Sequence, residues 1–124
     1  MAKVLGLGGI FFTSQDPEKL SGWYKTHLGL SIDFPHGSVL HADQMPKGAY
    51  TVWSPFPSDT DYFAPSNQPF MINFVVDDLE GALKQVQEGG AEIVGKIEES
   101  EFGKFGHFVD PEGNKVELWK PVGE

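Results

Sequence analysis

The sequence predicts an α+β domain made of two similar halves, each with the order strand, helix and three strands. The first observation behind this is an internal echo, in which Thr51–Pro55 has the same pattern as Glu117–Pro121, 66 residues later. A second echo links Ile10–Asp16 with Ile72–Asp78 at an offset of 62 residues, and a helical pattern follows each copy. A period of about 64 residues is too long for a solenoid unit, so a duplicated half-domain is favoured.

Length and composition are those of one globular domain, which we expect to span residues 1–124. The chain has 40% hydrophobic residues, no apolar run of membrane-spanning length, no signal-peptide pattern and no cysteine, so we expect a cytoplasmic protein without disulfides. The net charge is −9 and all nine basic residues are lysines. An acidic chain without arginine is a poor binder of nucleic acid, and we expect no nucleic-acid or membrane partner. The acidity would help attract a cationic ligand or would serve only solubility.

The first half, module 1, covers about residues 4–55. Asp16-Pro17 is a typical helix start, an apolar stripe follows from Leu20 to Leu28, and Gly29 is a typical helix end. Four strands are predicted around this helix, over residues 4–13, 30–34, 38–42 and 49–53.

Residues 54–69 join the halves, and we assign the linker itself to about 56–69. Four prolines in this stretch deny it regular structure. Long ordered connections are often binding elements, so Phe56, Tyr62 and Phe63 could cover a pocket or simply dock the linker onto the core.

The second half, module 2, covers about residues 70–121. A strand is predicted over 70–76, followed by a helix capped by Asp77 or Asp78, with Glu80 in a capping box if Asp77 is the cap. A short strand is predicted over 91–94 and an acidic loop over 96–104, before the final strand pair.

The final strand pair turns at Asp110-Pro111-Glu112-Gly113, where proline presets φ, Asp110 can bond to the turn backbone and Gly113 accepts a positive φ. A three-residue loop with a glycine bulge then pairs Asp110 with Asn114 and places His107 opposite Glu117. The two-residue period puts Trp119 on the face of Glu117. Val116 and Leu118 fall on the other face, where we expect a helix to cover them.

A carboxylate, an imidazole and an indole on one face predict a lined pocket. Glu117 could act as a proton acceptor or hold a ligand, or Glu117 and His107 could only satisfy each other as buried polar groups. The repeat makes His41 the counterpart of His107, and Thr51 the counterpart of Glu117. Trp53 and Trp119 could sandwich a planar or cationic ligand, or pack a sheet edge or subunit interface.

The chain resembles the vicinal oxygen chelate superfamily, which includes glyoxalases, bleomycin-resistance and fosfomycin-resistance proteins and extradiol dioxygenases. The resemblance rests on the two modules, Asp16-Pro17-Glu18-Lys19 before an aromatic helix, Leu28-Gly29-Leu30, and Asp110–Asn114 before Val116-Glu117-Leu118. It covers essentially the whole chain. It implies two βαβββ modules that form a curved mixed sheet around a cavity, and commonly a homodimer.

The resemblance also implies four metal-ligand positions, which fall here on Gly9, Thr51, Met71 and Glu117. Only Glu117 suits a metal, so this sequence resembles a member whose metal site is depleted, and we expect no cofactor. A displaced divalent-metal site made by His41, His107 and Glu117 is the alternative.

These observations favour a metal-independent protein that binds a small organic molecule, cationic or aromatic, in the sheet cavity. His41, Thr51, Trp53, His107 and Trp119 are the expected ligand-binding residues. The alternatives are a glyoxalase-like or dioxygenase-like metalloenzyme with altered ligands, and a metal-free lyase or isomerase with Glu117 as the catalytic base.

Overall fold

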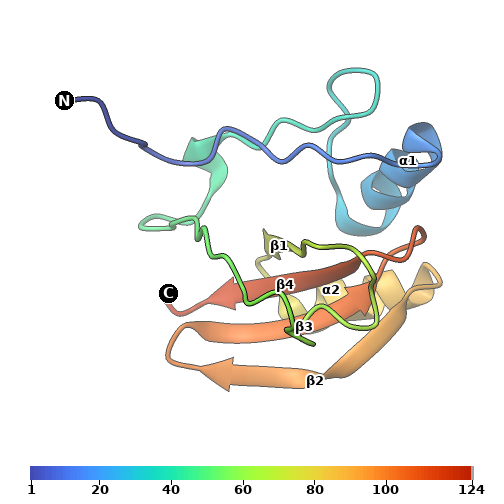
Figure 1. The fold of residues 1–124 in the computed structure, drawn as a ribbon. Helices are drawn as coiled ribbons and strands as arrows, with labels where there is room; N and C mark the ends of the chain where they lie inside the picture. The colour runs from blue at the N-terminus through green and yellow to red at the C-terminus, as the bar shows by residue number, and fades with distance from the viewer. Residues whose placement is uncertain (124) are drawn as a thin grey trace.

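The computed structural model describes residues 1–123 and shows an α+β fold with a four-stranded mixed sheet (Figure 1). The sheet order is β1-β4-β3-β2, with β1 parallel to β4 and the other neighbours antiparallel. All four strands come from the second half, which therefore has the predicted order of strand, helix and three strands. The elements are α1 (Pro17–Leu28), a 3₁₀ turn (Ala42–Gln44), β1 (Ile72–Val75), α2 (Leu79–Glu88), β2 (Glu92–Ser100), β3 (Gly103–Val109) and β4 (Lys115–Pro121).

Both helices have an aspartate as the N-cap residue that precedes them. Asp16 accepts a hydrogen bond from the Lys19 amide at 3.1 Å, and α1 ends at Gly29 in the left-handed conformation, as predicted. Asp78, and not Asp77, caps α2 by accepting from the Gly81 amide, so Glu80 does not occupy a capping-box position. No helix among residues 1–123 has the length and apolarity that crossing a membrane requires.

β2 is longer than the sequence predicted. The predicted strand 91–94 extends to Ser100, and most of the predicted acidic loop 96–104 is strand, with a bulge between Val94 and Glu98. β2 is an edge strand, and an edge strand can carry exposed glutamates because one of its sides faces solvent. That is why a charged segment that looks like a loop forms a strand here.

The core lies between one face of the sheet and the two helices. Val116 and Leu118 of β4 are fully buried there, as predicted for the face opposite Glu117. The cluster also contains Leu20, Tyr24, Leu79, Ala82, Val86 and Phe108. Thus α1, which belongs to the first half, packs onto the sheet of the second half.

The turn between β3 and β4 holds α1 in this position. The Tyr24 hydroxyl donates to Asp110 Oδ2 at 2.9 Å, and burial together with the nearby Asp110 charge raises the pKa of Tyr24. Glu112 accepts from the Ser14 hydroxyl at 2.6 Å and from the amides of Gln15 and Asp16. The hydrogen bond from Ser14, with those from the two amides, outweighs desolvation and lowers the pKa of Glu112.

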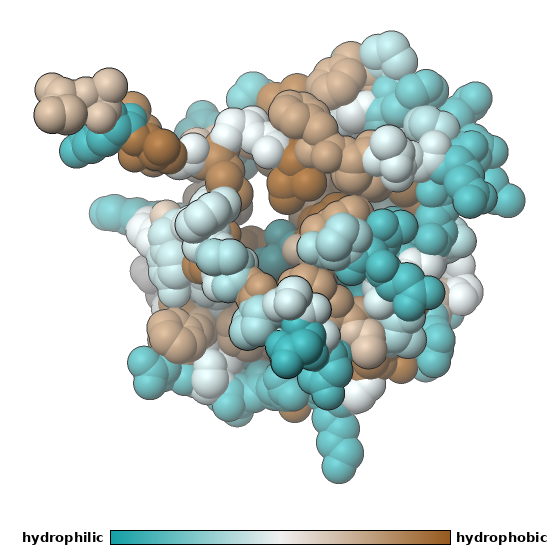
Figure 2. Space-filling view, viewed as in Figure 1, coloured by the Kyte–Doolittle hydropathy of each residue, from teal (hydrophilic) through white to brown (hydrophobic). Residues whose placement is uncertain are grey.

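The four strands predicted in the first half are not formed. Among residues 1–71 the only ladder contact is an isolated bridge between Phe34 and Gly37. A strand needs a neighbour to satisfy its backbone groups, and these segments run apart from the sheet in Figure 1. Their apolar side chains are exposed, with Phe11 at 93% and Trp53 at 77%. Figure 2 shows hydrophobic residues around a hollow between these segments and the sheet.

Candidate functional site

The register of β3 and β4 is set by their turn. The Asp110 amide donates to the Asn114 carbonyl at 2.8 Å, and Asp110 Oδ1 accepts from the amides of Glu112 and Asn114. Gly113 has φ of 84°, as the predicted turn requires. His107 therefore pairs with Glu117 in the observed ladder, which confirms the predicted register.

Glu117 is the centre of a hydrogen-bonded cluster on the sheet face opposite the helices. Its Oε1 accepts from Asn73 Nδ2 at 2.7 Å, and Asn73 stands beside it on β1. Its Oε2 accepts from the Tyr62 hydroxyl at 2.7 Å and lies 2.8 Å from His107 Nε2. Since an ionised carboxylate only accepts, Nε2 carries the proton in this contact. Both carboxylate oxygens are thus engaged by protein groups.

The cluster keeps Glu117 ionised. Burial by itself would raise the pKa of Glu117, but the hydrogen bonds from His107, Tyr62 and Asn73 outweigh it and the pKa lies below its ordinary value. Burial and the hydrogen bond to this carboxylate raise the pKa of Tyr62, so its phenol stays a neutral donor.

Lys115 lies two residues before Glu117 on the same face of β4. Its Nζ donates to the Tyr62 carbonyl at 2.6 Å and stands 4.9 Å from the centroid of the Tyr62 ring. Tyr62 comes from the linker, and Phe56 stacks on its ring at 5.8 Å. The linker is therefore docked onto the face that carries Glu117 and His107, and Tyr62 makes the contact.

Trp119 extends this face with an aromatic surface. Its ring stacks on Phe105 at 5.7 Å and meets the edge of Tyr50 at 5.3 Å, while its Nε1 donates to the Phe102 carbonyl at 2.8 Å. Trp53 is exposed, and the aromatic partners of Trp119 are Phe105 and Tyr50 instead. The structure thus shows no indole sandwich among the described residues.

The remaining predicted residues lie away from the cluster. His41 and Thr51 are exposed in the first half, and neither is among the hydrogen-bond partners of Glu117 in the described part of the chain. Of the positions that correspond to family metal ligands, Gly9 and Thr51 are exposed and Met71 is half-buried. Within residues 1–123 no three His, Asp or Glu side chains are grouped in a way that could hold a metal ion. His107 and Glu117 are in contact, and His41 stands apart on an exposed segment of the first half.

Three members of the cluster were not identified as site residues by the sequence. Lys115 had a usable signal, because the two-residue strand period places it on the face of Glu117. Asn73 lay on a predicted strand whose neighbour was unknown. Tyr62 was singled out only as an aromatic that could cover a pocket.

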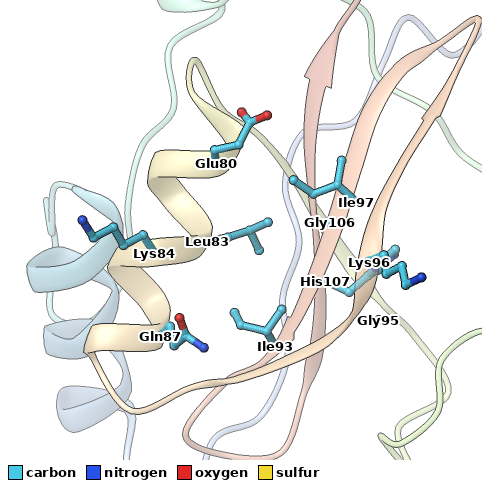
Figure 3. A pocket seen from close by; sticks show the side chains of 10 residues that line it. All are labelled: Glu80, Leu83, Lys84, Gln87, Ile93, Gly95, Lys96, Ile97, Gly106 and His107. Carbon is cyan, nitrogen blue, oxygen red and sulfur yellow. The ribbon is translucent and has the colours of Figure 1, made fainter.

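An open cavity of about 360 Å³, whose lining includes His107, lies on the helix side of the sheet, between α2 and the bulge of β2 (Figure 3). Leu83 and Ile93 point into it. The side chains of Lys84 and Lys96 point outward from its rim in different directions, so they offer no converging polar group. The cluster around Glu117 is therefore the better candidate site.

Comparisons with known proteins agree with the fold. A family model described as "Glyoxalase-like domain" matches residues 9–119. Among solved structures, a protein from the mobile metagenome of V. pseudocholerae, VPC_CASS1, is 20% identical with a TM-score of 0.58, over 99% of both chains. A protein of unknown function from Agrobacterium tumefaciens strain C58 is 16% identical with a TM-score of 0.58, over 94% of this chain and 98% of the other.

TnmS3, an antibiotic binding protein from Streptomyces sp. CB03234, is 21% identical with a TM-score of 0.52, over 87% of this chain and 88% of the other. No sequence among the curated proteins matches the chain. At these identities the structures show a shared fold, whereas the family match covers most of the chain. The chain belongs to the glyoxalase-like domain family.

Proposed function

We propose that this protein binds a small organic molecule, without a metal, on the sheet face that carries Glu117, His107 and Trp119. The observation that carries the proposal is the state of Glu117, whose two oxygens are both occupied by donors from the protein. Such a carboxylate is held in a fixed position, and it lies beside the aromatic surface formed by Trp119 and its partners. This combination of a few fixed polar groups with apolar walls is characteristic of small-molecule sites.

The donor set does not fit the metal that the superfamily implies. Glycine at position 9 has no side chain to offer, and the thioether of Met71 is a poor partner for the hard or borderline ions that carboxylates bind. Thr51 is exposed. Glu117 would have to give up Tyr62 or Asn73 to coordinate an ion. We therefore propose that binding is metal-independent.

The same hydrogen bonds favour binding over catalysis by a Glu117 base. A general base works best with a pKa near the operating pH, whereas the pKa of Glu117 is lowered. Its proton-accepting positions are also occupied. A relative of the same fold, TnmS3, is an antibiotic binding protein, so the fold can hold a ligand as its task.

The proposal is tested by a thermal-shift screen of small aromatic compounds with and without divalent metals. At 100 Kd a ligand raises the free energy of unfolding by about 2.7 kcal/mol. We expect Trp119→Leu and Glu117→Gln to remove the shift, and the exposed Glu99→Gln on β2 to retain it. The proposal fails if no compound stabilises the protein, or if the purified protein carries a stoichiometric metal needed for binding. Turnover that Glu117→Gln abolishes while binding persists would establish the metal-free enzyme instead.

We also propose that the protein is a homodimer. The exposed apolar side chains of the first half, Phe11 and Trp53 among them, are more than an isolated soluble domain normally leaves in contact with water. A second chain would cover them and give the extended segments strand partners. Sedimentation velocity should give twice the chain mass, and Phe11→Ser should lower the dimer fraction, whereas the exposed polar substitution Gln15→Ser should not. A monomer at millimolar concentration contradicts this.

A further inference from the structure

Tyr62 is the only hydrogen-bonded link between the linker and the sheet among residues 1–123. The linker's other hydrogen bonds are local, as in the turns closed by Thr60, Ala64 and Ser66. Tyr62 by contrast is held at both ends by side chains of the sheet. Among the described residues, the linker's hydrogen bonds to the sheet are thus all made by one residue.

The two ends of Tyr62 meet groups of opposite charge. Its peptide carbonyl accepts from Lys115 Nζ at 2.6 Å, and its hydroxyl donates to Glu117 Oε2 at 2.7 Å and lies 3.3 Å from His107 Nε2. Between the ends, its ring stacks on Phe56 and meets the His107 ring edge-on at 5.6 Å. The site therefore holds an aryl ring with an acceptor at one end and a hydroxyl donor at the other.

Lys115 is poorly matched in this arrangement. It is 7% exposed, yet its ammonium belongs to neither of the two ion pairs formed by the described residues. An ammonium has three donors, and the structure gives Nζ one acceptor, a neutral carbonyl. A buried cation gains more from a carboxylate, because charge-assisted hydrogen bonds are about twice as strong as neutral ones. The end of the site formed by Lys115, where the Tyr62 carbonyl now lies, is therefore suited to an anion.

We propose that Tyr62 is an internal stand-in for the ligand, and that the ligand is an aromatic acid with a hydroxyl group at the far end of its ring. Its carboxylate replaces the Tyr62 carbonyl at Lys115, and its hydroxyl replaces the Tyr62 phenol at Glu117. This rests on the proposed function, since it assumes binding on this face, and it names the ligand class. It also replaces the expectation of a cationic ligand, because Glu117 already has its donors and no carboxylate within residues 1–123 pairs with Lys115.

Binding by displacement makes the linker a competitor of the ligand. The measured affinity is the intrinsic affinity multiplied by the fraction of protein in which Tyr62 has left the site. A change in Tyr62 itself that weakens its hold, and leaves Lys115 and Glu117 intact for the ligand, should therefore strengthen ligand binding. Loss of an ordinary contact residue would do the opposite.

The test uses three probes of matched size: 4-hydroxyphenylacetate, phenylacetate and tyramine, titrated by calorimetry or NMR. We expect 4-hydroxyphenylacetate to bind most tightly and phenylacetate about tenfold more weakly, because one hydrogen bond to a charged group is lost. Tyramine should bind worst, since its ammonium would face Lys115. Tyr62→Phe should tighten binding of 4-hydroxyphenylacetate several-fold by removing the competing phenol.

Lys115→Met should weaken 4-hydroxyphenylacetate about tenfold or more and remove the preference for acid over amine. Lys120→Met, on the same strand but on its other face, is the matched control and should change neither. If Lys115→Met fails to fold, the Tyr62→Phe result and the probe order decide alone.

Equal or tighter binding of tyramine overturns the proposal, as does weaker binding of 4-hydroxyphenylacetate by Tyr62→Phe. If none of the three probes binds while other aromatic compounds do, the ligand class is wrong and the proposed function stands. If no aromatic compound binds at all, the proposed function itself fails.

Discussion

At the scale of single residues, the site depends on Glu117 and its three partners. Asn73, His107 and Tyr62 come from β1, β3 and the linker, so one carboxylate joins three parts of the chain. These contacts form only when the strands are in register and the linker is docked on the sheet. Loss of the charge on Glu117 should therefore be felt in stability as well as in binding.

Glu117→Gln tests this through its pH dependence. Because the folded-state pKa of Glu117 is lowered from about 4.5, its ionised form contributes stability above the unfolded-state pKa and loses it as pH falls through the folded-state value. We expect the variant to be about 1–3 kcal/mol less stable than wild type at pH 7. The difference should shrink below about pH 4.5.

Urea unfolding at pH 7 and at pH 3.5 measures this difference. Glu99→Gln, an exposed carboxylate of β2, is the control and should stay within about 0.5 kcal/mol of wild type at both pH values. A stability difference between Glu117→Gln and wild type that is the same at both pH values would show that the hydrogen bonds, and not the charge, carry the effect.

At the scale of elements, two glycines differ in whether the backbone around them could accept a side chain. Gly103 begins β3 with φ of 121°, and a Cβ there would collide with the carbonyl oxygen of Lys120 on β4. Gly22 lies within α1, where a Cβ would meet no atom within 4 Å. The same substitution should therefore have opposite effects in the two elements.

We expect Gly103→Ala to cost about 1–3 kcal/mol or more through backbone strain and the collision with β4. Gly22→Ala should stabilise by about 0.5–1 kcal/mol, because alanine is the better helix former. Thermal unfolding of the two variants and of wild type measures both changes in stability. Equal effects of the same sign would contradict the geometry of either β3 or α1.

At the scale of the whole molecule, the two halves share one core. Leu20 and Tyr24 of α1 are buried against α2 and the sheet, although they belong to the half whose strands are not formed. The first half is thus held to the second through α1 and through the turn that contains Asp110 and Glu112.

Leu20→Ala should therefore destabilise the whole protein and not only α1. We expect a loss of about 2–4 kcal/mol, as for other buried leucines, with a single cooperative transition. Circular dichroism and tryptophan fluorescence should report the same midpoint. The readout uses a background in which Trp23 and Trp53 are phenylalanine, so that Trp119 of β4 is the fluorophore. If helix signal is lost well before this fluorescence changes, α1 is a separate unit and the shared core is not cooperative.

Local sequence features were sufficient to predict the turns and helix caps, whose geometry depends on residues that are neighbours in the chain. The turn at Asp110–Gly113 predicted the pairing of His107 with Glu117 because proline, aspartate and glycine limit a hairpin to few geometries. The caps at Asp16 and Gly29 were predicted for the same reason. The repeat and the motifs were sufficient for the α+β fold class and for the resemblance to glyoxalases.

The rest depended on contacts between distant residues. No local pattern says that Tyr62 reaches Glu117, that Asn73 stands beside β4, or that α1 packs on the second-half sheet. Strand formation in the first half could not be decided locally either, because a strand exists only where a neighbour satisfies its backbone. The sequence by itself determined the fold class, the final strand pair and its paired His and Glu. Only the tertiary structure decided what surrounds that pair, because burial and hydrogen-bond partners are properties of the packed chain.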